Sequence, residues 1–442
     1  MAEQHSWKTQ PRAAAWVRER VDEFLADNPA AAEFQNLLRD ETGTRLVDWI
    51  DHFELRDVTG IEEAGYVRDD DGWFRHPEAL LPPVVFREHE RLLLRVDSVR
   101  DFVTANAHRF ACDVGGEPLD LWRTASVRSG SSRSFGVVER QGCRTSRKGV
   151  ERSPHDKLLT EMCREQLRTR RRRFEDRETA FRETRELLTS MISRIGVDVT
   201  CELFFEAERA YWQSRNRAAR VQYMRQQTLG LGWGNHDHHT YRSSRAAFHH
   251  LVGILELLGF HGRERFYAGA DAGWGAQVLE QPVTGIVIFA DVDLSPEEIT
   301  GDIAHEPLPP RDSVGTIGLW CYLHGEAIFE AGMHHLECQF EFDNARRQLE
   351  QFGIRCMAPF TDFPHLRQCF TEGEVWAVED SRIAAALQQG WITPEQADRF
   401  AASGVVGSHL EILERNDGYR GFNQTGINDI IRKTDPRFLT SP

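Results

Sequence analysis

Two stretches of the chain show the same order of expected elements, and this repeat is the feature that most limits the fold. In the first stretch, the hydrophobic pattern predicts a strand, an amphipathic helix and three further strands, at 235–244, 245–258, 264–268, 276–280 and 285–291. In the second, it predicts a strand, a helix, further strand candidates and a closing strand, with the clearest parts at 333–342, 343–352 and 409–415. Such self-similarity is a fold-level signal. The sequence therefore predicts an α+β fold with two βαβββ units in tandem.

The period of two along a strand decides which polar side chains share a face. It predicts three groups that each lie on one face: His238, Thr240 and Arg242; His335, Glu337 and Gln339; His409, Glu411 and Leu413. If the two units curl into one half-barrel, one histidine from each opening strand and one glutamate from the closing strand converge. Two imidazoles and one carboxylate leave three open positions on a metal, as in non-heme Fe(II) oxygenases. We therefore predict His238, His335 and Glu411 as metal ligands.

Two neighbouring residues are rival ligands. His334 directly precedes His335, although alternation would point it away if His335 faces inward. Glu414 is offset by three residues from Glu411 and so belongs to the opposite face of that strand. Both alternatives stay open, because a slip of one residue in the register reverses every facing assignment.

Three motifs in these strands resemble known dioxygenase families. The closing segment LEILERNDGYRGFNQTGINDII, residues 410–431, looks like the C-terminal signature of 4-hydroxyphenylpyruvate dioxygenases. DHHTYR, at 237–242, resembles the Asp-His-x-x-x-Arg element of 2-oxoadipate dioxygenase/decarboxylases. MHHLE, at 333–337, is similar to the element that opens the second unit in both families. The resemblance covers about residues 231–435 and points to the vicinal-oxygen-chelate group of non-heme iron dioxygenases.

The resemblance implies a vicinal-oxygen-chelate half-barrel with one Fe(II) per chain and O₂ as co-substrate. In these families a 2-oxo acid is oxidatively decarboxylated and the same molecule is hydroxylated, so the expected partner is a small-molecule carboxylate. Arg242 would grip a carboxylate of the substrate. His409 would support the metal ligands or act as an acid or base. A final helix after Phe422 would cover the site and exclude water.

Other interpretations of the same residues stay open. Arg242 could be a salt-bridge partner instead of a substrate clamp. The metal could serve extradiol ring cleavage, isomerisation or lyase chemistry, acting as a Lewis acid or directing oxygen differently. The fold could also bind a small molecule without catalysis.

Composition narrows the partners. A formal net charge of -15 argues against nucleic acid or an anionic membrane surface, both of which attract basic proteins. No run approaches the roughly 18 apolar residues that a membrane span needs, and the polar N-terminus lacks the apolar stretch of a signal peptide. The eight cysteines form no CxxC pair, so we expect reduced thiols and a cytoplasmic protein.

The rest of the chain is expected to fall into three parts before a catalytic domain at 231–442. Residues 1–125 read as an α+β region, 126–154 as a basic loop or linker rich in Gly and Ser, and 155–230 as a helical segment. This largely helical N-terminal extension could cover the pocket or pair two subunits in a homodimer. His52, in WIDHFEL, mimics a metal-bearing opening strand and would mark a degenerate third unit with a structural role.

Overall fold

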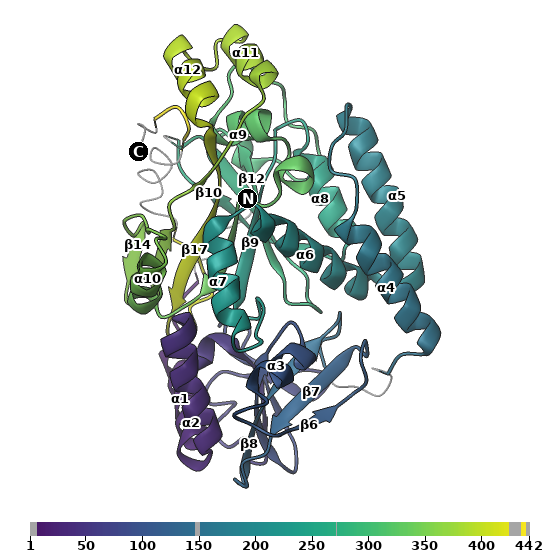
Figure 1. The fold of residues 1–442 in the computed structure, drawn as a ribbon, viewed down its shortest axis with the longest axis vertical. Helices are drawn as coiled ribbons and strands as arrows, with labels where there is room; N and C mark the ends of the chain where they lie inside the picture. Colours follow the sequence, from purple (N-terminus) through teal and green to yellow (C-terminus); the bar gives the residue numbers. More distant parts are fainter. Residues whose placement is uncertain (1–6, 146–150, 271, 424–434, 439–442) are drawn as a thin grey trace.

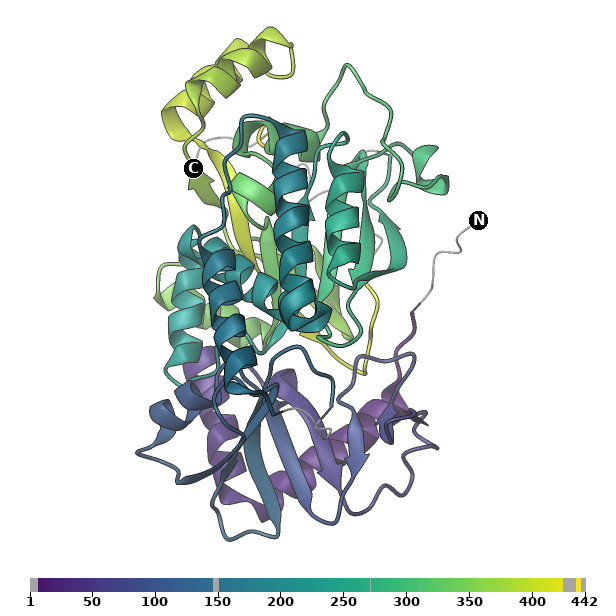
Figure 2. The ribbon, with the colours of Figure 1, turned by 90° about the vertical axis from the view of Figure 1, so that its right-hand side faces the viewer.

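The computed structural model describes residues 7–145, 151–270, 272–423 and 435–438. Each of its two parts is built around a mixed sheet, the first in the lower half of Figure 1 and the second in the upper half. Figure 2 shows the same two parts from the side, with the N-terminal helices in purple against the first sheet.

The second sheet contains both predicted units. Its strands lie in the order β10 (His261–Tyr267), β11 (Trp274–Glu280), β12 (Val287–Asp293), β9 (His236–Arg242), β13 (His335–Gln339), β17 (Val405–Arg415), β15 (Leu366–Phe370) and β14 (Thr361–Phe363), while β16 (Glu374–Trp376) pairs with β17. The two opening strands, β9 and β13, pair antiparallel at the centre, and each runs parallel to the last strand of its own unit. The helices α8 (Phe248–Leu257) and α10 (Phe342–Gln351) follow the opening strands. The prediction of tandem βαβββ units in a vicinal-oxygen-chelate arrangement is confirmed.

The first sheet repeats this topology. Its strands lie in the order β2 (Val67–Arg68), β3 (Trp73–Arg75), β4 (Val84–Phe86), β1 (Ile50–Leu55), β5 (Glu90–Arg95), β8 (Arg133–Arg140), β7 (Trp122–Val127) and β6 (Cys112–Gly115). β1 and β5 pair antiparallel at the centre, and they run parallel to β4 and β8. The N-terminal region therefore has helices, as predicted, and in addition two units of strands. The second unit contains α3 (Val99–Asn106), but the described residues between β1 and β2 form no helix. The prediction of a loop over 126–154 is wrong for β8, where Phe135 and Val137 pack into the first core and Val138 packs into a separate cluster.

Strand register aligns the two sheets residue by residue. His52 opposes Leu93 across β1 and β5, as His238 opposes Glu337 across β9 and β13. Leu93 in turn pairs with Gly136, as Glu337 pairs with Glu411. The first sheet thus has leucine and glycine where the second has two glutamates. A Cβ at Gly136 would lie 2.3 Å from the carbonyl oxygen of Ala125, so this position has no room for a carboxylate.

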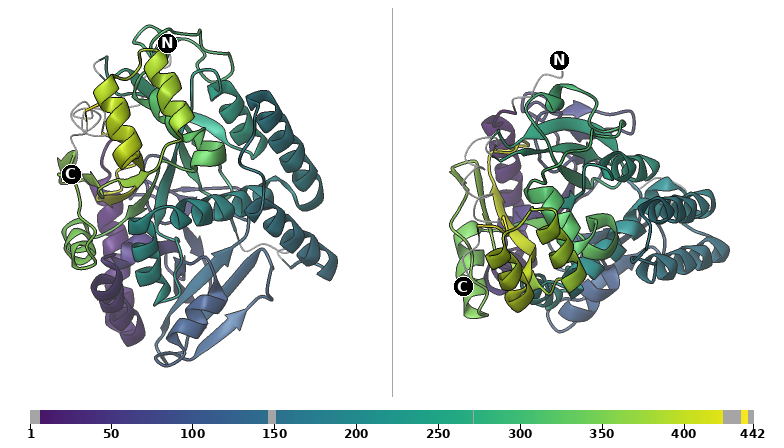
Figure 3. Two further views of the ribbon diagram at one scale, coloured as in Figure 1. Left: turned by 45° about the horizontal axis from the view of Figure 1, so that its top comes forward. Right: turned by 90° about the horizontal axis from the view of Figure 1, so that it is seen from above.

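Helices complete the layers around the sheets. α1 (Pro11–Asp27), α2 (Pro29–Leu37) and α3 (Val99–Asn106) pack on the first sheet, and α4 (Pro154–Arg168), α5 (Arg177–Ile195) and α6 (Val197–Ser214) share the core of the second. α9 (Thr316–His324), α11 (Asp380–Gln388) and α12 (Pro394–Ser403) form a separate group. Figure 3 shows that α11 and α12, in yellow-green, and α4 and α5, in dark teal, lie on different sides of this part. None of the described helices is long and apolar enough to cross a membrane.

Two helices hold the strands that carry the predicted ligands. Asn216 caps the N-terminus of α7 (Arg217–Gln227). Its side chain accepts a hydrogen bond from the Ala219 amide and donates one to Ser408 of β17. On α6, the buried Glu208 accepts hydrogen bonds from Arg170 at 2.9 Å and from Tyr241 of β9 at 3.1 Å. These contacts fix β17 and β9 from the side of the sheet that faces the core.

We predict that Glu208→Ala lowers the free energy of unfolding by about 3–5 kcal/mol, because it leaves Arg170 and Arg172 buried without their counter-charge. Urea denaturation measures the loss. Glu206→Ala on the same helix is the control. Glu206 is 45% exposed, and its one ion pair among the described residues is with Arg164, so its loss should stay within about 1 kcal/mol. Equal losses in the two variants would contradict the prediction.

Candidate metal centre

Three strands at the centre of the second sheet bring four possible metal ligands together. His238 comes from β9, His335 and Glu337 from β13, and Glu411 from β17. One ligand atom from each lies within 4.8 Å of the others, and all four residues are buried. Their neighbours along the strands, including Leu336, Cys338, Leu410 and Ile412, belong to the core on the opposite face. Alternation of polar and apolar residues therefore builds the cluster.

The four side chains form two close pairs. His238 Nε2 lies 2.8 Å from Glu337 Oε2, and His335 Nε2 lies 3.0 Å from Glu411 Oε2. Gln368 of β15 donates to Glu411 at 3.2 Å and more weakly to Glu337 at 3.4 Å. Each histidine thus points the same nitrogen toward a carboxylate, and the four donor atoms surround one small volume.

Burial and the closeness of the two glutamates shift the pKa values of the cluster. Burial raises the pKa of Glu411 well above its ordinary value, and the adjacent Glu337 raises it further. Burial alone would lower the pKa of His238, but the carboxylates of Glu337 and Asp237 raise it to about 9. Burial holds the pKa of His335 well below its ordinary value, and the nearby His238 adds to this effect. Imidazole nitrogens and carboxylate oxygens are ligands that Fe(II) accepts, so the donor set fits that metal.

A hydrogen-bonded frame orients His238. Its Nδ1 lies 3.1 Å from Asp237 Oδ2. Asp237 accepts two hydrogen bonds from Arg415, each of 2.9 Å, and one from Gln339 of 3.1 Å. Burial would raise the pKa of Asp237, but the Arg415 guanidinium holds it well below the ordinary value. Asp237 therefore stays ionised and directs Nε2 of His238 into the cluster.

The cluster forms one end of a cavity of about 90 Å³. Six aromatic side chains form the apolar part of its wall: Phe266, Trp274, Phe289, Phe360, Phe370 and Phe422. The polar groups of the wall, apart from the four possible ligands, are Thr240, Arg242, Asp291, His334, Gln368 and Asn423. An apolar wall with a few polar groups is typical of small-molecule sites.

Arg242 and Asp291 lie in register on β9 and β12 and line this cavity. Among the described residues, no carboxylate oxygen lies within 4.0 Å of the Arg242 guanidinium, whose buried Nε has no hydrogen-bond partner. Burial raises the pKa of Asp291 to about 7, even though Arg242 acts in the opposite direction. The pocket therefore contains an arginine without an internal ion pair and a carboxyl group that can carry a proton near neutral pH.

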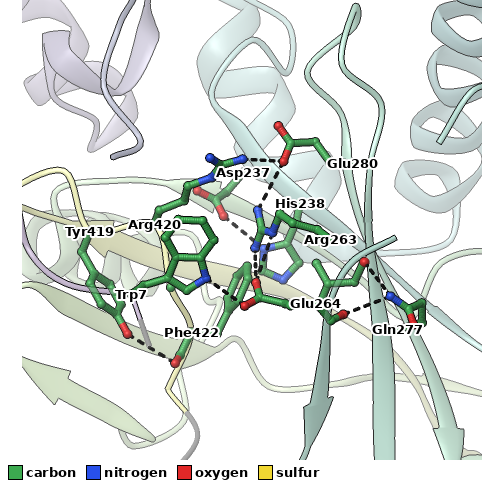
Figure 4. A network of polar contacts seen from close by, with 12 residues as sticks. Trp7, Asp237, His238, Arg263, Glu264, Gln277, Glu280, Tyr419, Arg420 and Phe422 are labelled. Atoms are coloured by element: carbon green, nitrogen blue, oxygen red, sulfur yellow. Dashed lines mark hydrogen bonds and ion pairs between the residues drawn. The ribbon is translucent and has the colours of Figure 1, made fainter. Parts of the chain in front are cut away.

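The segment after β17 closes the pocket from one side. The Phe422 ring centroid lies 4.4 Å from that of Phe289 and 5.3 Å from that of His238. Figure 4 shows the polar contacts that hold this segment, with Arg420 bound to Glu280 and Arg263 bridging toward Glu264. The predicted final helix falls in residues 424–434, which lie outside the described residues.

The other predicted site residues lie around the cluster in different ways. His334 lines the cavity, but its Nδ1 lies 3.0 Å from the Gly407 carbonyl oxygen, and it is not one of the four donors. Glu414 is turned away and accepts a hydrogen bond from the Phe342 amide at 2.8 Å. His409 pairs with His335 in the sheet, and its Nδ1 lies 2.8 Å from the Thr371 carbonyl oxygen. His409 is not among the residues that line the cavity, and its catalytic role stays a prediction.

Three residues of the site were not assigned a role from the sequence. Glu337 was placed on the face of His335, but the pattern could not show that it meets Glu411 across the strands. Asp291 ends the apolar run GIVIFA, where a buried carboxyl group is unusual and could have been noticed. Gln368 belongs to a strand whose sequence gives no comparable signal.

Comparisons with known proteins give a distant likeness in fold. No family model matches the chain, and no curated protein matches it. A mutant 4-hydroxymandelate synthase from Streptomyces coelicolor aligns at 11% identity with a TM-score of 0.30, over 77% of this chain and 95% of that one. The 2,3-dioxygenase LapB from Pseudomonas sp. KL28 aligns at 10% and 0.20, over 86% and 95%.

Methylmalonyl-CoA epimerase from Mycobacterium tuberculosis aligns at 14% identity with a TM-score of 0.24, over 41% of this chain and 87% of that one. Because these TM-scores lie below 0.5, the likenesses do not determine what this chain does. The local geometry of the cluster is the stronger guide to function.

Proposed function

We propose that this chain is a mononuclear non-heme iron(II) oxygenase that oxidatively decarboxylates and hydroxylates a 2-oxo acid or a related small carboxylate. The observation that carries the proposal is the buried cluster of two histidines and two glutamates at the end of an aromatic cavity. His238, His335 and Glu411 would hold the iron. When bound, Fe(II) would supply the redox chemistry that O₂ and the 2-oxo acid require, since three protein ligands leave open positions for both.

The remaining residues have roles that follow from their contacts. Arg242, which makes no ion pair with any residue that the structure describes, would bind a carboxylate of the substrate in a bidentate manner and so orient it. Asp291, with a pKa of about 7, would hold or release a proton within the cavity. The aromatic wall and Phe422 would exclude water from the reacting groups.

Glu337 favours a second candidate function. If both Glu337 and Glu411 bind the metal, only two positions stay open on an octahedral ion, which suits a chelated substrate but leaves none for O₂. The metal would then act as a Lewis acid in an isomerase or lyase. In the oxygenase proposal, Glu337 would not bind the metal and would instead accept the hydrogen bond from Gln368.

Metal analysis of protein purified without oxygen tests the site. We expect about one iron per chain in the wild type, and its loss in His238→Ala, His335→Ala and Glu411→Ala, because each variant removes one of three ligands. His334→Ala is the matched control and should keep its iron, since His334 lines the cavity but is not one of the four donors. Circular dichroism checks that each variant folds.

Glu337→Gln separates the two candidates. Retained iron, with O₂ uptake and CO₂ release on 2-oxo acids, supports the oxygenase. Loss of metal in this variant, or turnover of a substrate without O₂ uptake, supports the isomerase or lyase. A wild type that holds no metal even after reconstitution contradicts both.

We expect Asp237→Asn to weaken iron binding by roughly 10- to 100-fold, because the carboxylate that orients His238 is lost. Titration of the metal-free protein with Fe(II) measures the change. Asp51→Asn removes the equivalent carboxylate, beside His52 in the first sheet, and should leave iron affinity unchanged. Equal weakening in both variants would mean that the effect is on the fold and not on the ligand.

We expect Arg242→Gln to raise the KM for a 2-oxo acid by about tenfold or more while the iron content is unchanged, because a charged hydrogen bond to the substrate is lost. Steady-state O₂ uptake measures KM and kcat. An unchanged KM would show that Arg242 does not contact the substrate and would favour a structural role.

A further inference from the structure

A second and larger cavity lies between the two sheets. Its volume is about 760 Å³, and its lining includes Asp51 of β1 and Asp237 of β9. Phe422 lines both this cavity and the cavity of about 90 Å³ beside the four possible ligands, which we call the metal pocket. Figure 4 shows one wall, where Arg420, Glu280 and Arg263 surround Asp237 and His238.

The lining of this cavity is rich in arginine. Nine arginines and six carboxylates face it: Arg18, Arg45, Arg75, Arg95, Arg140, Arg144, Arg263, Arg415 and Arg420, with Asp22, Asp48, Asp51, Asp237, Glu280 and Asp417. The lining is therefore positively charged, although the whole chain has a net charge of -15. A concave basic surface in an acidic protein attracts and holds anions.

Most of the carboxylates are matched one to one, away from Asp51. The pairs are Arg45 with Asp48 at 2.7 Å, Arg18 with Asp417 at 3.3 Å, Arg415 with Asp237 at 2.9 Å and Arg420 with Glu280 at 2.6 Å. At the Asp51 end, Arg95 also pairs with the buried Glu202 at 3.3 Å, and Arg75 Nε pairs with Asp69 at 3.1 Å. Among the described residues, the guanidinium at this end that has no carboxylate partner is that of Arg144.

Four arginines gather at that end. Arg140 Nε lies 3.0 Å from Asp51 Oδ1, and Arg95 lies 3.9 Å from the same oxygen. Arg75 Nη2 is buried and has no hydrogen-bond partner among the described residues. Arg144 makes no ion pair or hydrogen bond to any residue that the structure describes. Burial lowers the pKa of Arg75, and the charge of Arg144 lowers it further, which reflects repulsion between the two guanidinium groups.

More arginines lie near Asp51 in the first sheet than near the equivalent aspartate in the second sheet. Asp237, the equivalent of Asp51, is held by one arginine and one neutral amide, Arg415 and Gln339. Gln339 belongs to the second sheet, and Arg95 occupies the equivalent position in the first sheet. Glu202 accounts for Arg95, and Asp69 accounts for Nε of Arg75. Nη2 of Arg75 and the guanidinium of Arg144 have no partner among the described residues, so these two groups call for another explanation.

We propose that the Asp51 end of this cavity binds a small anion with phosphate or carboxylate groups, held by Arg75, Arg140 and Arg144. Guanidinium groups bind both kinds of oxyanion through paired hydrogen bonds. A ligand there would supply the missing partner of Arg75 Nη2 and neutralise the repulsion between Arg75 and Arg144. The site is distinct from the metal pocket and does not depend on the function proposed for it.

Calorimetric titration of the metal-free full chain tests the proposal, with inorganic phosphate and succinate as separate probes at constant ionic strength. We expect saturable binding of at least one probe, weakened tenfold or more in Arg75→Gln/Arg144→Gln. Arg18→Gln, at the other end of the cavity and already paired with Asp417, should bind as the wild type does. Arg242→Gln should also bind normally, because its side chain belongs to the metal pocket.

The probes and variants separate the outcomes. Tighter binding of phosphate or of succinate identifies the class of anion. Binding that is lost in Arg242→Gln but kept in the double variant would place the anion in the metal pocket and overturn the proposal. Absence of saturable binding of either probe to the wild type would also overturn it. Because Arg75→Gln also removes the ion pair with Asp69 at 3.1 Å, circular dichroism and the melting temperature check that the double variant is folded.

Discussion

Two glutamates are buried side by side in the second sheet, and the surrounding residues must compensate their charge. Glu337 and Glu411 lie opposite each other on β13 and β17. A buried carboxylate without a partner is costly, and two neighbours add repulsion. Among the described residues, no arginine or lysine nitrogen lies within 4.0 Å of either; the partners are His238 and His335. A divalent cation between the four groups would satisfy both carboxylates at once, which makes an otherwise aromatic surrounding tolerable.

The first sheet has the same strand order but lacks the two buried glutamates at the equivalent positions. It keeps the Asp-His pair, with His52 Nδ1 2.7 Å from Asp51, and an arginine on the aspartate. Leu93 and Gly136 stand at the positions of the two glutamates, and the space near His52 is filled by the rings of Trp73 and Trp122, at 4.9 and 5.5 Å between centroids. The framework of buried aspartate and arginine is therefore compatible with an apolar interior, and only the second sheet adds the charged cluster.

The repeat, the element types and the faces of His238, His335 and Glu411 could be predicted from the sequence because alternation along a strand depends only on local pattern. That these three residues bind a metal stays a prediction. The same alternation placed Glu337 on the face of His335. It could not show that this glutamate meets Glu411, because that depends on the register between strands far apart in sequence. β8 was missed because its valines stand among the Ser, Gly and Arg residues of a segment that resembles a linker. The sequence of residues 1–125 predicts an α+β region, with His52 marking a degenerate third unit, but it does not show that eight strands complete a second sheet with the same strand order.

Asp237 and Asp51 explain why one chain can contain two separate polar sites. Both aspartates line the large cavity, and each contacts a histidine of its own sheet. At Asp237, Arg415 is fully used, because it binds both carboxylate oxygens and the Gly421 carbonyl. Near Asp51, Arg140 pairs with Asp51 and Arg95 with Glu202, while Arg144 has no carboxylate partner among the described residues. The arginine that supports His238 through Asp237 is therefore not the group that we propose to bind an anion. On this proposal, the first sheet would provide a second binding surface without altering the geometry of the four-residue cluster of histidines and glutamates.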